Sequence, residues 1–245
     1  MSIITKWMDE TLYPRYGEQW DDALFRSSLE QYISSESVCL DYGAGRGNVK
    51  QMNFLNVAKF VAGVDPDKAV FKNPYLNEAK LLNLSGSIIP YEDNEFDVVF
   101  SDNVLEHVAD IEITFKEIIR VLKPGGVFVS KTPNKWHYMP FIARVTPTGF
   151  HRFYNKLRGR DVSDTFPTLY RCNTKADVMK YARKVGFTIE KIQFVEGRPE
   201  YLRLTALTYL FGFLYERIVN STRRLAAFRC VMIFGLSKMP SAGNP

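Results

Sequence analysis

The chain has 245 residues, of which 46% are apolar and 24% charged, and its formal net charge is +5. These proportions are ordinary for a folded globular protein, and the chain has no repeat or low-complexity tract, which excludes a fibrous or largely disordered protein. A mildly basic balance permits an anionic substrate or membrane surface as a partner, and no nucleic acid is expected. The length suits one domain, residues 1–245.

The N-terminal segment, residues 1–36, has a helical apolar pattern that predicts a helix over about 16–34. The first ten residues contain no long apolar core, so we expect no secretion signal and a cytoplasmic protein. Cys39, Cys172 and Cys230 have neither metal-like nor disulfide-like spacing, and we expect them in the core.

Residues 38–48 follow as a short apolar strand and a glycine-rich turn, which we expect to lead into a helix. Asp41 precedes Gly43, Gly45 and Gly47 in the order D-x-G-x-G-x-G. Glycines at such a turn allow unusual backbone angles and let a ligand touch the main chain. The dinucleotide fingerprint G-x-G-x-x-G has its third glycine one residue later, which disfavours an NAD-dependent oxidoreductase without closing that alternative.

Further strands are predicted at 59–67, 79–84, 97–101 and 127–131, with a helix over 111–122. The second strand ends at Asp65, where a carboxylate can accept hydrogen bonds from both hydroxyls of a ribose. The third strand is followed by Ser85, Gly86 and Ser87 rather than by an acid.

Three segments together carry a resemblance to a known family: the glycine loop, residues 89–101 (IPYEDNEFDVVFS) and residues 104–108 (VLEHV). They resemble motifs of the class I S-adenosylmethionine (SAM)-dependent methyltransferases, in particular the methyltransferase type 11-like family. The resemblance implies an α/β, Rossmann-like fold with a seven-stranded, mostly parallel sheet whose last strand is antiparallel, and SAM as cofactor. It places the cofactor on Asp41, Gly43, Ala44, Gly45, Gly47, Asp65, Pro66, Ser85, Gly86 and Ser101.

The C-terminal half departs from regular alternation in two places. Residues 132–172 are rich in proline, aromatic and basic residues, and we expect an insertion that shapes an acceptor pocket. A helix over 173–184 and a strand over 188–195 resume the pattern, a helical insertion is expected at 200–227, and residues 230–236 should form the last strand, between the fifth and sixth.

The residues after the fourth strand bear on the acceptor. Methyltransferases that act on nucleobase or amide nitrogens commonly carry an Asn/Asp-Pro-Pro-Tyr motif at this position, where this chain has Ser101-Asp102-Asn103-Val104. The difference argues against a nitrogen acceptor and favours a hydroxyl, a carboxylate or an activated carbon, of which we expect an oxygen. A hydroxyl needs a base, and histidine is the usual choice. The candidates are His107, His137 and His151, and the expected substrate contacts are Glu106, Trp136, Tyr138, Arg152 and Arg158. Asn103 replaces the third acid of related metal sites, so no metal is expected.

Several alternatives stay open. The chain could be a catalytically silent SAM-binding partner of another enzyme. Residues 165–174 and 200–203 loosely resemble bacterial methyltransferases of envelope glycan or lipid-linked substrates, so the acceptor could be a small molecule, a glycan or a lipid-linked compound. The uncharged run 204–215, followed by arginines, suits either peripheral contact with the inner face of a membrane or packing on the domain itself or on a second copy in a homodimer.

Overall fold

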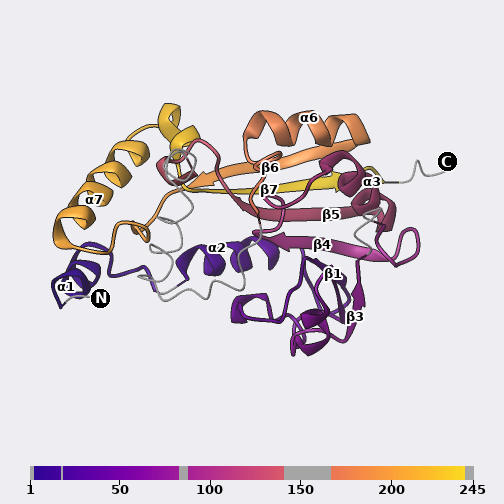
Figure 1. Ribbon diagram of the computed structural model, residues 1–245. Helices are drawn as coiled ribbons and strands as arrows, with labels where there is room; N and C mark the ends of the chain where they lie inside the picture. Colours follow the sequence, from indigo (N-terminus) through magenta and orange to yellow (C-terminus); the bar gives the residue numbers. More distant parts are fainter. Residues whose placement is uncertain (1–2, 18, 83–87, 141–166, 241–245) are drawn as a thin grey trace.

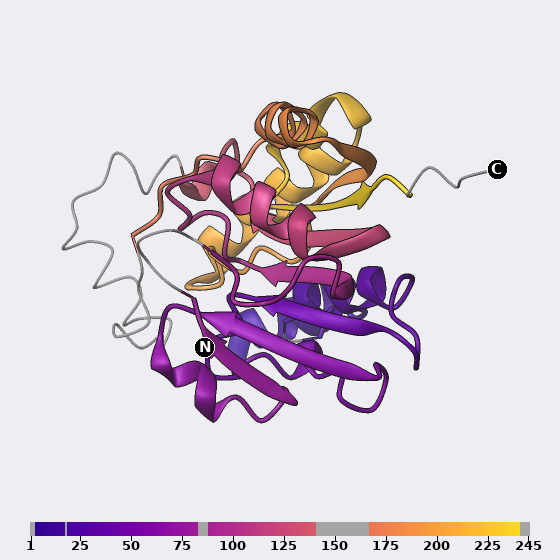
Figure 2. The ribbon, with the colours of Figure 1, turned by 90° about the vertical axis from the view of Figure 1, so that its right-hand side faces the viewer.

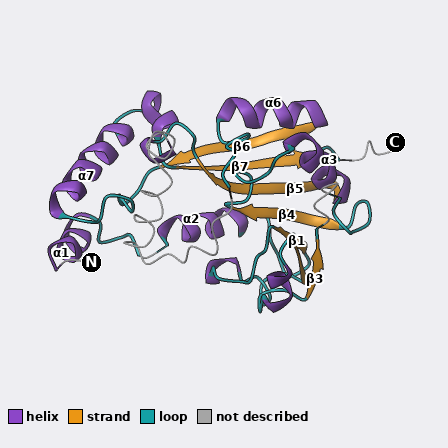
Figure 3. Cartoon of the chain, in the orientation of Figure 1, coloured by secondary structure: helices purple, strands orange, loops and turns teal. Residues whose placement is uncertain are grey.

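A seven-stranded sheet forms the middle layer of the protein (Figures 1 and 3). The structure is a computed structural model that describes residues 3–17, 19–82, 88–140 and 167–240. The strands are β1 (Val38–Tyr42), β2 (Phe60–Asp65), β3 (Glu78–Leu81), β4 (Phe96–Asp102), β5 (Leu122–Pro133), β6 (Phe187–Val195) and β7 (Val231–Lys238). Their order is β3-β2-β1-β4-β5-β7-β6, and β7 runs antiparallel to both of its neighbours. The predicted fold class is confirmed.

Five described α-helices accompany the sheet. They are α1 (Ile3–Leu12), α2 (Trp20–Leu29), α3 (Ile111–Val121), α6 (Lys175–Val185) and α7 (Ala206–Asn220), and the 3-10 turns are η1 (Lys50–Met52), η2 (Lys68–Lys72) and η4 (Arg223–Phe228). The side chains of Asp110 and Thr174 cap α3 and α6, and Gly186 ends α6 in the left-handed conformation. None of these helices has the length and apolar character needed to cross a membrane.

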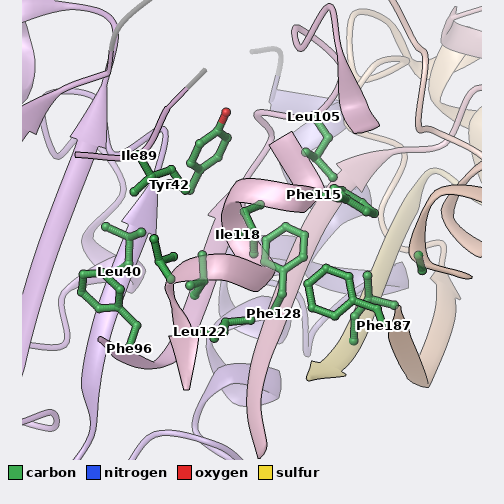
Figure 4. Packing of buried hydrophobic residues seen from close by; sticks show 14 of the residues in the cluster. Leu40, Tyr42, Ile89, Phe96, Leu105, Phe115, Ile118, Leu122, Phe128 and Phe187 are labelled. Atoms are coloured by element: carbon green, nitrogen blue, oxygen red, sulfur yellow. The ribbon is translucent and has the colours of Figure 1, made fainter. Parts of the chain in front are cut away.

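Each face of the sheet has its own apolar core. On one face, α3 and α6 pack against alternate strand residues such as Leu40, Val99 and Phe128, and Figure 2 shows the two helices on the same side of the strands. Figure 4 shows the rings of Phe96, Phe115, Phe128 and Phe187 among the aliphatic side chains of this core. On the opposite face, Phe25 and Leu29 of α2 pack against Cys39, Val98 and Phe100. The period of two along each strand therefore decides which layer a side chain enters.

The prediction of a helix directly after the glycine loop was wrong. Residues 48–59 contain only the short turn η1, and α2 from the N-terminal segment covers this part of the sheet instead. The guanidinium of Arg26 donates to the carbonyls of Gln51 and Asn53, at 2.7 and 2.8 Å. Asparagine at 48, 53 and 56 also has weak helix propensity, so the segment forms no long helix and instead runs along α2.

The N-terminal segment also differs from its prediction. The helix expected over 16–34 is the shorter α2, and a separate helix, α1, precedes it. α1 packs against α7 beyond the carboxyl ends of the parallel strands (Figure 1). Hydrogen bonds join the Tyr13 hydroxyl to Glu216 and the Tyr209 hydroxyl to Asp9. Segments two hundred residues apart in sequence thus form one small helical unit.

Candidate active site

Strand alternation brings three charged side chains to one place. Alternate residues of three strands face α2. They are Cys39 and Asp41 on β1, Val98, Phe100 and Asp102 on β4, and Val127, Val129 and Lys131 on β5. Asp102 and Lys131 are register partners at the carboxyl ends of their strands. The apolar rows under α2 therefore end in Asp41, Asp102 and Lys131.

The glycine loop leaves β1 with a conformation that its glycines make possible. Gly43, Gly45 and Gly47 all have positive φ, at 82°, 50° and 78°. A Cβ on Gly43 would lie 2.3 Å from the Val104 side chain, and a Cβ on Gly47 would lie 2.5 Å from Asn73, whereas a Cβ on Gly45 would meet nothing within 4 Å. The first and third glycines thus allow close packing inside the protein, and the second faces open space.

Asp65 braces this loop from β2. One of its carboxylate oxygens accepts the backbone N–H of Gly45 at 2.9 Å, and the other accepts that of Asp67 at 2.8 Å. The amide of Asn73 also donates to the carbonyl of Ala44, at 2.9 Å. The loop is therefore held in shape by the carboxylate that was predicted to receive a ribose.

A cavity of about 250 Å³ opens above the loop. Its lining includes Asp41, residues 43–49, Asn73, Tyr75, Asp102 and Asn103. Burial, reinforced by Asp102 and Asp65, raises the pKa of Asp41. An open glycine backbone and two buried carboxylates suited to a cationic amino-acid end line this cavity, which fits SAM, so we call it the cofactor cavity. Asp65 is not among the lining residues, but it contacts the loop that forms the wall. Asp41, Asp102 and the loop would hold the methionine end, and Asp65 the ribose.

The remaining residues predicted to contact the cofactor lie elsewhere or outside the described part. Pro66 is exposed and is not among the residues that line the cofactor cavity. Ser101 is fully buried on the opposite face of the sheet, where its hydroxyl donates to Ser130 at 2.8 Å. Its neighbour Asp102, which alternation turns the other way, lines the cavity instead. Ser85 and Gly86 lie outside the described residues.

A buried lysine ties α2 to this site. The Lys131 ammonium is fully buried, pairs with Asp22, and lies 3.1 Å from Asp21 and 2.9 Å from Asp102. Burial alone would lower the pKa of Lys131, but the three carboxylates raise it, so the lysine stays charged. Burial raises the pKa of Asp102 to about 7 although Lys131 opposes the shift. We refer to these four residues as the lysine cluster.

A larger cavity of about 500 Å³ adjoins the cofactor cavity and shares Val49 and Asn103 with its lining. We call it the acceptor cavity. Asn103 has a φ of 53°, the left-handed conformation that asparagine tolerates, and its N–H donates to the carbonyl of Lys131 at 2.9 Å. The polar residues of the lining are Gln19, Asp21, Asp22, Asn103, Glu106, His107, His137, Tyr138, Glu196, Arg198, Glu200 and Tyr201.

Two of these residues, Glu106 and His107, form one candidate acid–base pair. His107 Nδ1 lies 2.9 Å from the carbonyl of Pro167, which can only accept, so Nδ1 carries a proton. Nε2 lies 4.0 Å from a carboxylate oxygen of Glu106. Burial raises the pKa of Glu106 to about 7, while a hydrogen bond from the Thr132 hydroxyl, at 3.1 Å, opposes the shift. A neutral His107 could therefore use Nε2 to take a proton.

The second candidate histidine has a different setting. His137 is fully buried, and burial lowers its pKa to about 3. The backbone N–H of Met139 donates to its Nδ1 at 3.4 Å, so Nε2 carries the proton and lies 3.5 Å from Glu196. Ligand atoms of His137, Glu196 and Cys230 lie within 4.8 Å of one another, a group that could hold an ion such as Zn²⁺.

Some of the predicted substrate contacts line the acceptor cavity, and others do not. Glu106 and Tyr138 line the acceptor cavity, whereas Trp136 is 60% exposed and is not part of the lining. His151, Arg152 and Arg158 lie outside the described residues. Sequence reasoning did not identify Asp21, Asp22, Asp102, Lys131 or Glu196 as site residues, although alternation from Asp41 could have indicated Asp102 and Lys131.

Comparisons with known proteins agree with this geometry. A family model described as a methyltransferase domain matches residues 40–130, which carry the glycine loop, β2, β4 and the Glu106–His107 pair. An uncharacterised methyltransferase of Mycolicibacterium gilvum is 32% identical over 183 residues, which are 67% of this chain and 68% of that protein. A sterol 4-C-methyltransferase of Caenorhabditis elegans is 32% identical over 130 residues, 46% of this chain and 37% of the relative.

The solved structures show the same fold. The crystal structure of the [4+2]-cyclase SpnF superposes with a TM-score of 0.59 over 93% of this chain and 85% of that one, at 17% identity. Against the C. elegans protein and two further curated relatives, the chain spans less than half of the relative's length. The match to the M. gilvum relative, the matched domain and the order of the seven strands all support one family. The chain belongs to the class I SAM-dependent methyltransferases.

Proposed function

We propose that the protein transfers a methyl group from SAM to a hydroxyl oxygen of a polar acceptor bound in the acceptor cavity. The observation that carries this proposal is the shared wall of the two cavities, Val49 and Asn103, because a displacement at the methyl carbon needs donor and acceptor in adjoining spaces. SAM supplies the methyl group and leaves as S-adenosylhomocysteine.

The acceptor cavity favours a molecule with several polar groups. Carboxylates of Asp21, Asp22, Glu196 and Glu200 and the guanidinium of Arg198 line it. Such groups can bind hydroxyls and are costly to bury against an apolar ring system. This supports a sugar-like or other polyhydroxyl head group over the flat apolar body of a sterol, although several relatives are named as sterol C-methyltransferases.

His107 is the base that the geometry supports best. As the acceptor oxygen forms its bond to the methyl carbon, its proton passes to Nε2 of His107, whose Nδ1 proton is already committed to Pro167. The carboxylate of Glu106, 4.0 Å away, would stabilise the resulting imidazolium. His137 supports this role less well, because its Nε2 carries the proton and its pKa is low.

The test is turnover with methyl-labelled SAM against sugar nucleotides, lipid-linked glycans, phenolic quinone precursors and sterols. The His107→Asn variant should bind SAM as the unaltered protein does, while kcat falls by about 10² to 10⁴. Label found on a sterol carbon would contradict the oxygen acceptor, and SAM binding without turnover on any class would favour the silent-partner alternative.

A further inference from the structure

The exposed face of α7 is apolar, and its buried face holds a charge. Five large side chains, which we call the apolar face of α7, are between 46% and 65% exposed: Leu207, Leu210, Phe211, Leu214 and Ile218. Their spacing of three and four residues places them on one side of the helix. Glu216, by contrast, is buried and accepts a hydrogen bond from the Tyr13 hydroxyl at 3.0 Å. This arrangement is the reverse of the usual pattern for a helix on a globular protein.

A second exposed apolar group lies at the same end of the molecule. Ile3, Ile4 and Trp7 of α1 are 89%, 58% and 61% exposed, and α1 packs against α7 (Figure 1). Phe228, in the turn η4 that follows α7, is 45% exposed. Exposed apolar side chains from three elements at one end are more than the scattered single residues expected on any surface.

The exposed charges of the α7–η4 segment, residues 206–228, are all positive. Arg217, Arg223 and Arg224 are exposed, whereas the one acid of this segment, Glu216, is buried. An isologous dimer through this face would pair the segment with a copy of itself, and residues 206–228 offer no exposed acid that could pair with the partner's arginines. An anionic lipid surface would instead complement both the cations and the apolar face.

We propose that the apolar face of α7, with Ile3, Ile4 and Trp7 of α1, docks on the surface of an anionic lipid bilayer. The helix lies in the plane of the interface, its apolar side chains enter the boundary between headgroups and acyl chains, and the arginines contact headgroup phosphates. This inference goes beyond the proposed reaction, because docking requires neither SAM nor acceptor.

The details of the helix differ in part from the sequence expectation of membrane contact. Tyr209 is buried, Tyr215 donates to the carbonyl of Phe228 at 2.6 Å, and Arg229 donates to the carbonyls of Val219 and Phe194. Phe213 packs against Tyr13, with ring centroids 6.2 Å apart. These four side chains belong to the protein interior or to local structure and are not part of the docking surface.

The inner face of α7 contacts the acceptor cavity. The Tyr215 ring lies 5.5 Å from that of His137 and 4.8 Å from that of Tyr138, both of which line the cavity. The segment between β6 and α7 adds Glu196, Arg198 and Glu200 to the same lining. A docked α7 therefore brings the bilayer beside the cavity, where the head group of a membrane lipid could enter it.

Co-sedimentation of the full chain with large vesicles tests the proposal. Vesicles of equimolar phosphatidylcholine and phosphatidylglycerol should bind the protein, vesicles of phosphatidylcholine alone should bind it at least about tenfold more weakly, and salt should release it. The double variant Phe211→Ser with Ile218→Ser should weaken binding at least about tenfold, because two large apolar side chains no longer enter the lipid.

A matched variant controls for surface hydrophobicity. Phe71 and Ile88 are 59% and 58% exposed, close to the 61% and 59% of Phe211 and Ile218, and they lie in the half of the chain that carries β2 and β3. Phe71→Ser with Ile88→Ser should leave vesicle binding unchanged, and thermal melting checks that both variants fold. Arg223→Glu with Arg224→Glu should weaken binding to the anionic vesicles only.

Three outcomes would overturn docking on anionic lipid. The first is no sedimentation at low salt together with a concentration-dependent dimer in ultracentrifugation, which would assign the face to a second copy. The second is equal loss of binding in the matched control. The third is equal binding to both vesicle types. All are measured without SAM or acceptor, so they are independent of whether the methyl transfer is correct.

Discussion

Asp65 holds the glycine loop in place before a ligand binds. Its two oxygens accept the N–H groups of Gly45 and Asp67, and it is 9% exposed. Because each carboxylate oxygen has a second lone pair, the same group can also accept the hydroxyls of a ribose. Asp65 thus fixes the geometry of the loop, and recognition of the cofactor's ribose by the same carboxylate stays a prediction.

Replacing Asp65 by Ala should weaken SAM binding tens-fold in calorimetry, since charge-assisted hydrogen bonds of this kind contribute about 2 to 3 kcal/mol. Asp67→Ala is the matched control. Asp67 is exposed, and its side chain accepts the N–H of Ala69 at the start of η2. Equal affinity of Asp65→Ala and the unaltered protein would place the ribose on another group.

Among single residues, motif spacing predicted some of those that line the cofactor cavity and missed others. Asp41 and the glycines line the cofactor cavity as the resemblance implied, because the loop is a local structure. Ser101 was selected in place of Asp102, since a motif indicates a strand end but does not say which face each residue occupies. The role of Lys131 depends on aspartates 110 and 109 residues earlier in the chain, a contact that no local pattern encodes.

Helix α2 shows how tertiary contacts replace local signals. The sequence predicted a helix directly after the glycine loop, but α2 packs on this part of the sheet instead. The Arg26 guanidinium of α2 lies 4.5 Å from the centre of the Phe54 ring. Propensity alone could not predict this exchange, because an amphipathic helix does not specify which part of a sheet it will cover. α3 and α6, with their caps and apolar periods, were predicted to within two residues at each end.

The lysine cluster should hold α2 on the sheet. Lys131→Met leaves Asp21, Asp22 and Asp102 facing one another without their cation, and breaking a buried ion pair in this way costs about 3 to 5 kcal/mol. Urea unfolding measures the change in the free energy of unfolding.

Lys123→Met is the control, because Lys123 lies on β5 as Lys131 does and pairs with Asp97 of β4 at 2.8 Å, but both of these side chains are more than a third exposed. Its loss should cost no more than about 1 kcal/mol. If the two variants lost the same stability, the cluster would not be what fastens α2.

The sheet gathers buried acids along its carboxyl edge. Asp102 and Glu106 have pKa values of about 7, and Glu196 of about 8, in each case mainly because of burial. These values exceed those of the same groups in an unfolded chain, so between about pH 4 and pH 8 these three acids bind more protons in the folded protein than in the unfolded one. Stability is then fully present below the unfolded pKa values and falls as the pH rises through the folded ones. Through these acids the architecture favours stability in mild acid, whereas the lowered pKa of His137 acts against stability as the pH falls below about 6.5. Neither effect could be inferred from the near-average charge content.

Glu196→Gln tests this whole-molecule property. Glutamine keeps an oxygen that can accept the N–H of Cys230, as Glu196 does at 2.8 Å, but it cannot ionise. The melting temperature of the variant should exceed that of the unaltered protein at pH 8 and approach it at pH 5, since the ionisation of a buried carboxyl costs on the order of a few kcal/mol. Glu112→Gln is the contrasting control: a hydrogen bond from Lys184 lowers the pKa of the partly exposed Glu112, so this change should not raise the melting temperature at pH 8. A Glu196→Gln protein that melted below the unaltered one at pH 8 would show that the Glu196 carboxylate is paired in the folded state, with a cation or with a metal ion bound beside His137 and Cys230.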